Sequence, residues 1–432
     1  MEHLLHYTWK HRLFPLQQLQ TTDGQSIEVI SVGTHNADAG PDFTGAQIKI
    51  GDMMWAGNIE IHTRSSDWYR HNHDVNAAYD GVVLHVVEDA DTEVYTSKGT
   101  RVPQLKMAIP HEVRTNYEQL VHSDKHPRCR AILPTLPQIL ITSWLATLSI
   151  ERLMWRTKQI MTRHKQCEYN WEDITFVTVA RNFGFGKNGD AFEQWALSIP
   201  KNAIAKHRDD LFQIEAIFFG QAGLLDEIVV NDYRRRLKSE YEYLQRKFSL
   251  RPIDPVVWKF MRTRPQNFPH VRIAQLAQLY CKGSFSLARM INAPSMDNLL
   301  RLFDVEVSEY WKTHYSFSTQ ATREHDKNLS ISSKKLIILN SVIPLMFAYG
   351  KYQSNDKLVN CALELLTQLK PEQNYIISLW QEAGIECSSA ADTQALLQLT
   401  RHYCEAKDCL QCRFGYEYIR SNPGYLNEEN GR

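Results

Sequence analysis

The chain has 432 residues, of which 43% are hydrophobic and 23% are charged, proportions that exclude a wholly disordered protein and favour two or three domains with buried cores. Lysine plus arginine equals aspartate plus glutamate, with 49 of each, which excludes a uniformly basic protein that coats nucleic acid. No stretch of 18 apolar residues is present, and the first ten residues lack a signal-peptide pattern, so we expect a cytoplasmic protein that does not associate with membranes.

The predicted elements change character along the chain. The expected N-terminal elements, in order, are a helix over 4–13, strands over 26–32, 43–50 and 54–62, a helix over 68–79, a buried central strand over 81–88 and a hairpin over 92–107. From residue 136 the apolar period is helical, and helical stretches recur to the C-terminal part of the chain. We therefore predict an α+β protein, with a mixed α/β sheet domain over 1–125 and a mostly helical domain over 126–432.

The balanced net charge conceals two unlike segments. Residues 1–125 carry 10 Lys or Arg against 17 Asp or Glu, a net charge of −7, together with 10 of the 17 histidines. Residues 126–432 carry 39 Lys or Arg against 32 Asp or Glu, a net charge of +7. This asymmetry is typical of a metal site beside a surface that binds a polyanion, although chance variation between two domains produces the same pattern.

One motif places two carboxylates on neighbouring strands. Asp42 follows Pro41 at the start of one predicted strand, and Glu60 lies near the end of the next. In an antiparallel hairpin these positions meet, so the two carboxylates could bind Mg²⁺ or Mn²⁺. His62 shares a strand face with Glu60 and is placed to assist an attacking water. The alternative interpretation is a Pro-Asp turn followed by an exposed Glu and His.

The order helix, strand, Pro-Asp strand, Glu-x-basic strand, helix, strand resembles that of the PD-(D/E)XK nuclease superfamily over about residues 1–105. In that superfamily the two acidic residues bind the metal, and a lysine orients or activates the water and stabilises the phosphate. The resemblance implies metal-dependent hydrolysis of nucleic-acid phosphodiesters, with Asp42, Glu60 and His62 as catalytic residues. His62 replaces the usual lysine, and it could act as a base, ligate the metal or mark an inactive relative.

A second resemblance covers nearly the full length, to a bacterial family built on a domain of unknown function. It implies a bacterial protein and supplies no activity. The residues that carry it are Asn36–Phe43 (NADAGPDF), Gly57–His62 (GNIEIH), Ser66–Trp68, the His71-x-His73 pair and Tyr79–Val87.

Histidines form a further candidate cluster. His62, His71, His73 and His85 lie within 24 residues, and Asp38 is near them in the chain. Because positions i and i+2 of a helix do not face each other, His71 and His73 can serve one ion only from a loop or an extended segment. His85 either points into the site or is a satisfied core histidine. We expect Asp38, His71, His73 and His85 to line the site, or else the four histidines to build a transition-metal site that hydrolyses a small molecule.

Three clustered cysteines suggest a second metal site. Cys404, Cys409 and Cys412 have the spacing of a metal knuckle. With His402 or Cys387 as fourth ligand they would bind zinc, and an iron–sulfur cluster is the other candidate. The alternative is a set of reduced thiols on a helix and the turn after it.

Basic residues in the helical part suggest a surface for nucleic acid. The candidate phosphate-binding residues are Arg234, Arg235, Arg236, Arg264 and Arg272. Interleaved acidic residues favour instead an ordinary solvated helix face. The leading function is therefore a metal-dependent nuclease, and the alternatives are a non-catalytic nucleic-acid-binding or scaffold protein with a degenerate site and a histidine-rich metallohydrolase of a small molecule.

Overall fold

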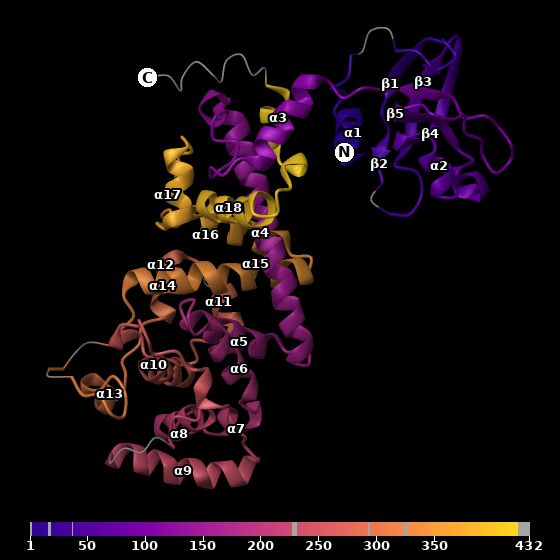
Figure 1. Cartoon of the computed structure of the whole chain (residues 1–432). Coiled ribbons are helices and arrows are strands. Elements are labelled where there is room, and N and C mark those ends of the chain that lie inside the picture. The colour runs from indigo at the N-terminus through magenta and orange to yellow at the C-terminus, as the bar shows by residue number, and fades with distance from the viewer. Residues whose placement is uncertain are drawn as a thin grey trace. The chain divides into compact units, whose positions relative to one another are not determined.

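The computed structural model describes residues 2–15, 19–36, 38–226, 231–292, 294–321, 323–324 and 327–421. A mixed β-sheet near the N-terminus precedes a mostly helical chain (Figure 1), which confirms the predicted α+β class. Contacts divide the chain into two compact units, the first formed by Met1–Ile141, Ser378–Ile385 and Leu399–Arg432 and the second by Thr142–Ile377 and Glu386–Gln398. The domain boundary predicted near residue 125 did not include the C-terminal segments that belong to the first unit.

The sheet of the first unit has the strand order β1-β3-β4-β5-β6, with β2 paired to β3. β3 is antiparallel to both of its neighbours, β1 and β4, whereas β4, β5 and β6 run parallel. The strands are β1 (Ile27–Ser31), β2 (Thr34–His35), β3 (Phe43–Ile50), β4 (Met53–Arg64), β5 (Val82–Asp89) and β6 (Gln104–Lys106). The apolar run of β5 is explained by its place inside the sheet. Within the hairpin expected over 92–107, Tyr95 and Arg101 form an isolated antiparallel bridge, and β6, which follows, pairs with β5.

The described helices of the first unit are short, and one differs from its prediction. They are α1 (Glu2–Lys10), α2 (Asp67–Arg70), α3 (His111–His122) and α19 (Arg413–Arg420). The helix expected over 68–79 is a single turn, because Asn72 adopts a left-handed conformation with φ of 59° and ends it. Two 3₁₀ turns follow, at His73–Val75 and Ala77–Tyr79. His71 and His73 therefore come from an irregular segment.

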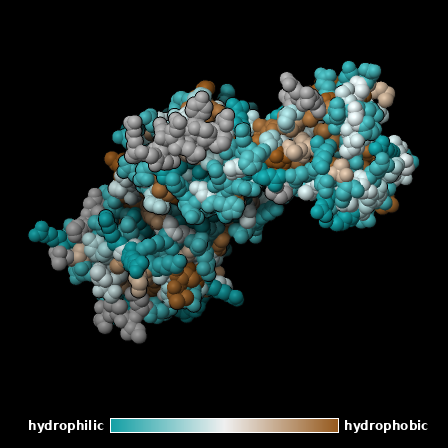
Figure 2. All heavy atoms as spheres, turned by 45° about the horizontal axis from the view of Figure 1, so that its top comes forward, coloured by the Kyte–Doolittle hydropathy of each residue, from teal (hydrophilic) through white to brown (hydrophobic). Residues whose placement is uncertain are grey.

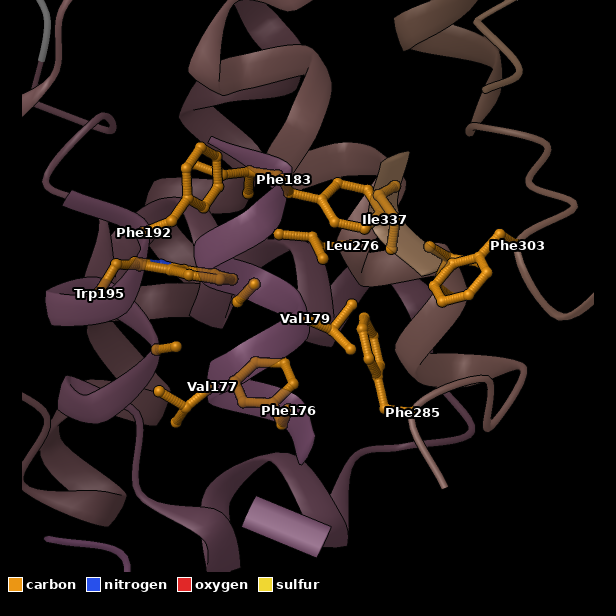
Figure 3. Packing of buried hydrophobic residues seen from close by; sticks show 14 of the residues in the cluster. Phe176, Val177, Val179, Phe183, Phe192, Trp195, Leu276, Phe285, Phe303 and Ile337 are labelled. Atoms are coloured by element: carbon orange, nitrogen blue, oxygen red, sulfur yellow. The ribbon is translucent and has the colours of Figure 1, made fainter. Parts of the chain in front are cut away.

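The second unit is helical around one aromatic-rich core. Its helices are α4 (Gln138–Gln166, from residue 142 onward), α5 (Trp171–Phe183), α6 (Gly189–Ser198), α7 (Lys201–Lys206), α8 (Leu211–Gln221), α9 (Asp232–Phe248), α10 (Pro269–Cys281), α11 (Leu287–Asn292), α12 (Met296–Leu302), α13 (Glu309–Thr313), α14 (Ile331–Ile337), α15 (Ile343–Tyr352), α16 (Asp356–Gln368), α17 (Tyr375–Glu382, as far as residue 377) and α18 (Ala390–Leu399, as far as residue 398). Phe176, Phe183, Phe192 and Trp195 pack in the core (Figure 3). The buried Trp195 indole N–H donates to the Phe218 carbonyl at 2.9 Å, which satisfies its polar group.

One described helical segment, Ile331–Tyr352, is long and apolar enough to cross a membrane, but 61% of its most apolar window is buried inside the structure. It contains a π-helical turn at Ile338–Val342. Pro344 has no amide hydrogen to donate to the Asn340 carbonyl, and that carbonyl instead accepts bonds from Arg156 at 3.3 Å and Asn182 at 3.1 Å. This burial is typical of a core helix. The face shown in Figure 2 is mostly hydrophilic, with hydrophobic residues in small patches.

Candidate functional site

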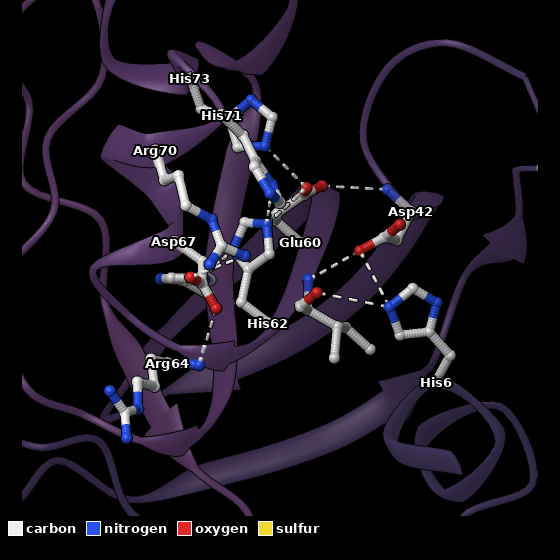
Figure 4. A network of polar contacts seen from close by, with 11 residues as sticks. His6, Asp42, Glu60, His62, Arg64, Asp67, Arg70, His71 and His73 are labelled. Carbon is white, nitrogen blue, oxygen red and sulfur yellow. Dashed lines mark hydrogen bonds and ion pairs between the residues drawn. The ribbon is translucent and has the colours of Figure 1, made fainter. Parts of the chain in front are cut away.

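The β3–β4 hairpin brings the two predicted carboxylates together. Phe43 pairs with Ile59, so Asp42 lies opposite Glu60. The Asp42 amide donates to Glu60 Oε2 at 3.1 Å, and the Ile61 amide donates to Asp42 Oδ2 at 2.9 Å. Each carboxylate is thereby held by the backbone of the other strand (Figure 4). The two acids are adjacent, as the hairpin argument predicts.

Glu60 also contacts two imidazoles, and a third lies beside them. Its Oε1 lies 3.1 Å from His73 Nε2 and 3.5 Å from His62 Nε2. His62 Nε2 lies in turn 3.1 Å from His71 Nδ1. One ligand atom from each of the three histidines lies within 4.8 Å of the other two. Glu60, His62 and His73 are buried and His71 is exposed, so this cluster, which we call the histidine cluster, reaches the surface at His71 (Figure 4).

His85 supports this cluster from the neighbouring strand. It pairs with Glu60 across the parallel β4–β5 ladder, and its side chain is fully buried. Its Nε2 lies 2.9 Å from Nδ1 of His62. This hydrogen bond leaves Nε2 of His62 directed at His71 and Glu60. A partner on the second ring nitrogen fixes the tautomer and orientation of a metal-binding histidine in the same way. His85 is therefore part of the site's surroundings, as expected for a site-lining residue.

Two aromatic residues that sequence analysis missed enclose the histidines. Tyr79 stacks on His73 with ring centroids 3.7 Å apart. The Trp68 ring lies 5.3 Å from the rings of both His73 and His85, and its indole N–H donates to the Tyr95 carbonyl at 3.0 Å. Both aromatic side chains are buried. They exclude water from one side of the cluster. In the sequence, both residues stood out only as members of the motifs that resemble the bacterial family of unknown function.

Burial determines the charge state of the site. Burial, followed by the neighbouring imidazoles, lowers the pKa of His62 to about 2 and that of His85 to about 3. Both rings are thus neutral near pH 7, the state in which an imidazole nitrogen can bind a metal. Burial and then the Glu60 carboxylate raise the pKa of Asp42 to about 6, while His6 acts in the opposite direction.

His6 of α1 is a further residue that the sequence did not single out. Its Nε2 lies 3.5 Å from Asp42 Oδ2 and 3.3 Å from the Ile61 carbonyl. It also lines a pocket of about 350 Å³ within the first unit. The pocket is lined mainly by basic and aromatic side chains, namely His3, His6, Tyr7, Lys10, His35, Tyr117 and Lys407, with Asp408, Leu410 and Gln411.

Other predicted site residues lie elsewhere. Asp38 is exposed in the loop before β3, and the contact described for it is a bond from its amide to Asn36 Oδ1 at 3.0 Å. Cys404, Cys409 and Cys412 are buried free thiols in the first unit.

The two expected fourth ligands differ in their placement. Cys387 belongs to the second unit, where burial and then Asp392 raise its pKa to about 11. His402 is half-buried in a π-helical turn at Thr400–Cys404.

The five arginines proposed to bind nucleic acid do not form one surface. Arg235, Arg236 and Arg264 are exposed and Arg234 is half-buried. Arg272 is buried: its guanidinium donates to Gln275 at 2.8 Å and to Asn267 at 2.6 Å, and it lies over the Phe185 ring. Arg272 therefore stabilises the helical core, which corrects its proposed place on a phosphate-binding face.

These features define an α+β protein whose sheet holds a buried cluster of histidines and carboxylates. The chain belongs to the family described as "Protein of unknown function (DUF2851)", whose model matches residues 2–375. No curated protein and no solved structure matches the chain. The family match includes every residue of the histidine cluster and ends before Cys404.

Proposed function

We propose that the protein is a metal-dependent hydrolase whose ion is bound by Glu60, His62, His71 and His73. The observation that carries this proposal is the spacing of the ligand atoms, which is 3.1 to 3.5 Å along the Glu60–His73, Glu60–His62 and His62–His71 contacts. Bond lengths of about 2.0–2.1 Å around a tetrahedral ion place neighbouring ligands about 3.3 Å apart. These three contacts thus have the spacing of neighbouring ligands around one ion, and one ligand atom from each of His62, His71 and His73 lies within 4.8 Å of the other two.

The nature of the donors favours a transition metal. Imidazole nitrogen suits zinc, iron and related ions, whereas Mg²⁺ prefers oxygen ligands and water. Mg²⁺ or Mn²⁺ held by Asp42 and Glu60 remains the alternative suggested by the carboxylate pair. A bound ion polarises the scissile group and lowers the pKa of an attacking water.

The chain's own residues would orient and assist this chemistry. The Asp42 amide holds Glu60 Oε2, which leaves Oε1 for the imidazoles. His85 holds the ring of His62. The Asp42 carboxylate, with its pKa raised to about 6 by burial and by Glu60, is suited to accept a proton near neutral pH. His6, at 3.5 Å from that carboxylate, is placed to pass the proton on.

We propose nucleic-acid phosphodiesters as the substrate class. The order of elements in the first unit is α1, β1, β3, β4, α2, β5, with β2 beside β3, and this order supports the resemblance to the PD-(D/E)XK nucleases. The pocket beside His6 carries Lys10 and Lys407, which suit a phosphate. The imidazole-rich ligand set favours the second candidate, a metallohydrolase of a small molecule.

Metal titration tests the proposal. The full-length chain, first treated with chelator, is titrated with Zn²⁺, Mn²⁺ and Mg²⁺ in a calorimeter. We expect tight binding of Zn²⁺ or Mn²⁺, at least a tenfold loss of affinity in Glu60→Gln and His73→Ala, and a 10- to 100-fold loss in His85→Asn through the outer hydrogen bond. His111→Ala, an exposed histidine of α3, is the matched control and keeps wild-type affinity.

Activity then separates the candidate functions. The metal-loaded protein is incubated with single-stranded and duplex DNA, with RNA and with a chromogenic phosphodiester. Cleavage of nucleic acid that is abolished by chelator and by Glu60→Gln supports the nuclease, and turnover of the small ester alone supports the metallohydrolase. Binding of nucleic acid without cleavage would identify a degenerate site. Equal metal affinity in wild type, Glu60→Gln and His73→Ala would refute the metal site itself.

A further inference from the structure

Four cysteines from two distant parts of the chain meet in the first unit. Cys404, Cys409 and Cys412 lie in its C-terminal segment, and Cys129 follows α3. All four are buried, and none forms a disulfide. Electrostatic interactions join Cys129 to the other three, and Cys404 to Cys409 and Cys412. Such interactions reach several ångströms between buried groups, so the four thiols lie in one region of the first unit. Among the described residues, three ligand atoms within 4.8 Å of one another occur at the histidine cluster, so the sulfurs are spaced more widely than the ligands of a single ion.

Backbone geometry holds Cys409 and Cys412 in a tight turn. Cys409 begins the 3₁₀ turn Cys409–Gln411, and the Cys412 amide donates to the Cys409 carbonyl at 3.2 Å. Helix α19 starts directly after Cys412. A Cβ at Gly415 of this helix would lie 2.1 Å from the Cys409 carbonyl oxygen, so the helix is packed against the turn and position 415 requires glycine. This is the geometry of a short Cys-x2-Cys knuckle.

A second irregularity positions Cys404. It ends the π-helical turn Thr400–Cys404, a helix distortion that often marks functional sites. The indole N–H of Trp380 donates to the Thr400 hydroxyl at 2.9 Å and anchors the turn. Lys407, with φ of 57°, then reverses the chain so that Cys409 follows on the same side.

Cys129 reaches the cluster because α3 packs against α19. The Asn116 side chain of α3 donates to the carbonyls of Ile419 at 3.0 Å and Ser421 at 2.8 Å, which fixes the end of α19. Tyr418 of the same helix interacts electrostatically with Cys129. These contacts depend on two segments far apart in the sequence, which is why the spacing of the C-terminal cysteines alone did not reveal the fourth.

A cation lies beside the thiols. Burial raises the pKa of Cys404 and Cys409, and the Arg128 guanidinium acts against that increase in both. Arg128 is itself held by bonds to the carbonyls of Val121 at 2.8 Å and Ser123 at 2.7 Å. A fixed cation offsets part of the negative charge that thiolates bring to a metal.

We propose that Cys129, Cys404, Cys409 and Cys412 bind one metal centre through four thiolates, with Cys129 as the fourth ligand. Four thiolates are the ligand set of a structural zinc site and of an iron–sulfur cluster, and the wide spacing of the sulfurs favours the iron–sulfur cluster, whose ligands bind different irons. The centre ties the C-terminal segment to the region after α3, so metal binding is coupled to the folding of this part of the first unit.

The test uses full-length protein produced with iron and sulfide available and purified without oxygen or chelator. A background with His62→Ala, His71→Ala and His73→Ala removes the three imidazole ligands of the histidine cluster, so failure of the proposed hydrolase site and failure of this site are seen separately. In that background we expect about one zinc per chain, or iron with visible absorption. X-ray absorption at the metal edge should show sulfur as the directly bound neighbour, at about 2.3 Å for zinc, with iron neighbours beyond it for an iron–sulfur cluster.

Serine variants identify the fourth ligand. Cys129→Ser should lose the metal as fully as Cys404→Ser, whereas Cys361→Ser, a half-buried cysteine of the second unit, should keep it. If Cys129→Ser does not fold, the X-ray absorption spectrum of the protein that carries only the background substitutions decides whether sulfur supplies all the metal ligands. Absence of metal, a shell of three sulfurs with one nitrogen, or full metal retention in folded Cys129→Ser would each overturn the proposal.

Discussion

Acidification of the metal-free protein should destabilise the sheet of the first unit. Burial lowers the pKa of His62 to about 2 and that of His85 to about 3, whereas an imidazole in the unfolded chain has a pKa of about 6.5. As pH falls through 6.5, protons bind the unfolded state and not the folded one. The free energy of unfolding therefore falls with pH below this value.

The magnitude follows from linkage. Between pH 7 and pH 5 each buried histidine lowers the free energy of unfolding by about 2 kcal/mol. Asp42 acts in the opposite direction, because its folded pKa of about 6 exceeds its ordinary value. Its protonation stabilises the folded state as pH falls through 6, by about 1 kcal/mol at pH 5. The net loss is roughly 2 to 3 kcal/mol.

Hydrogen exchange measured by peptide mass spectrometry reports this loss locally. After correction for the pH dependence of intrinsic exchange, protection of β4 and β5 should fall roughly 30- to 150-fold between pH 7 and pH 5, the equivalent of 2 to 3 kcal/mol. Helix α5 of the second unit is the internal control and should change little.

A substitution isolates the cause. His85→Leu removes one titrating group from a fully buried position, so the pH-dependent loss should shrink by about 2 kcal/mol and nearly vanish. His111→Leu, at an exposed position, should keep the wild-type loss. Unchanged protection of β4 and β5 at pH 5, or an equal loss in His85→Leu and wild type, would show that these histidines are not held neutral by burial.

Three further predictions concern the helical unit. Gly220→Ala would place a Cβ 2.1 Å from the Tyr241 ring, so urea denaturation should show a destabilisation of about 1–3 kcal/mol. Wild-type stability of this variant would contradict the close packing. Trp195→Ala should cost about 3–5 kcal/mol in the same assay, because the side chain is fully buried. Replacing the exposed Arg235 and Arg236 by alanine should weaken nucleic-acid binding uniformly across sequences and reduce its salt dependence; an unchanged salt slope would remove α9 from the interface.

Local patterns in the sequence were enough to predict the α+β class and the hairpin that carries Asp42 and Glu60. The alternating residues Phe43–Ile50 form β3 with the predicted bounds, and the Gly51-Asp52 turn sets the β3–β4 register as far as Ala46. A register shift between Ala46 and Phe43, which the residue pattern did not predict, then places Asp42 opposite Glu60. These features need only neighbouring residues, because side-chain alternation and turn chemistry act over a few positions. The family membership likewise rests on the sequence alone.

Tertiary structure decided which polar residues meet. The left-handed Asn72 ends α2, after which His73 contacts Glu60 while His71 contacts His62, whereas the residue pattern had favoured a longer helix. Packing between distant segments brought Cys129 to the C-terminal cysteines. Such contacts join residues that are far apart in the chain, and they form only when the surfaces between them are buried together. Spacing along the sequence therefore carries no record of them.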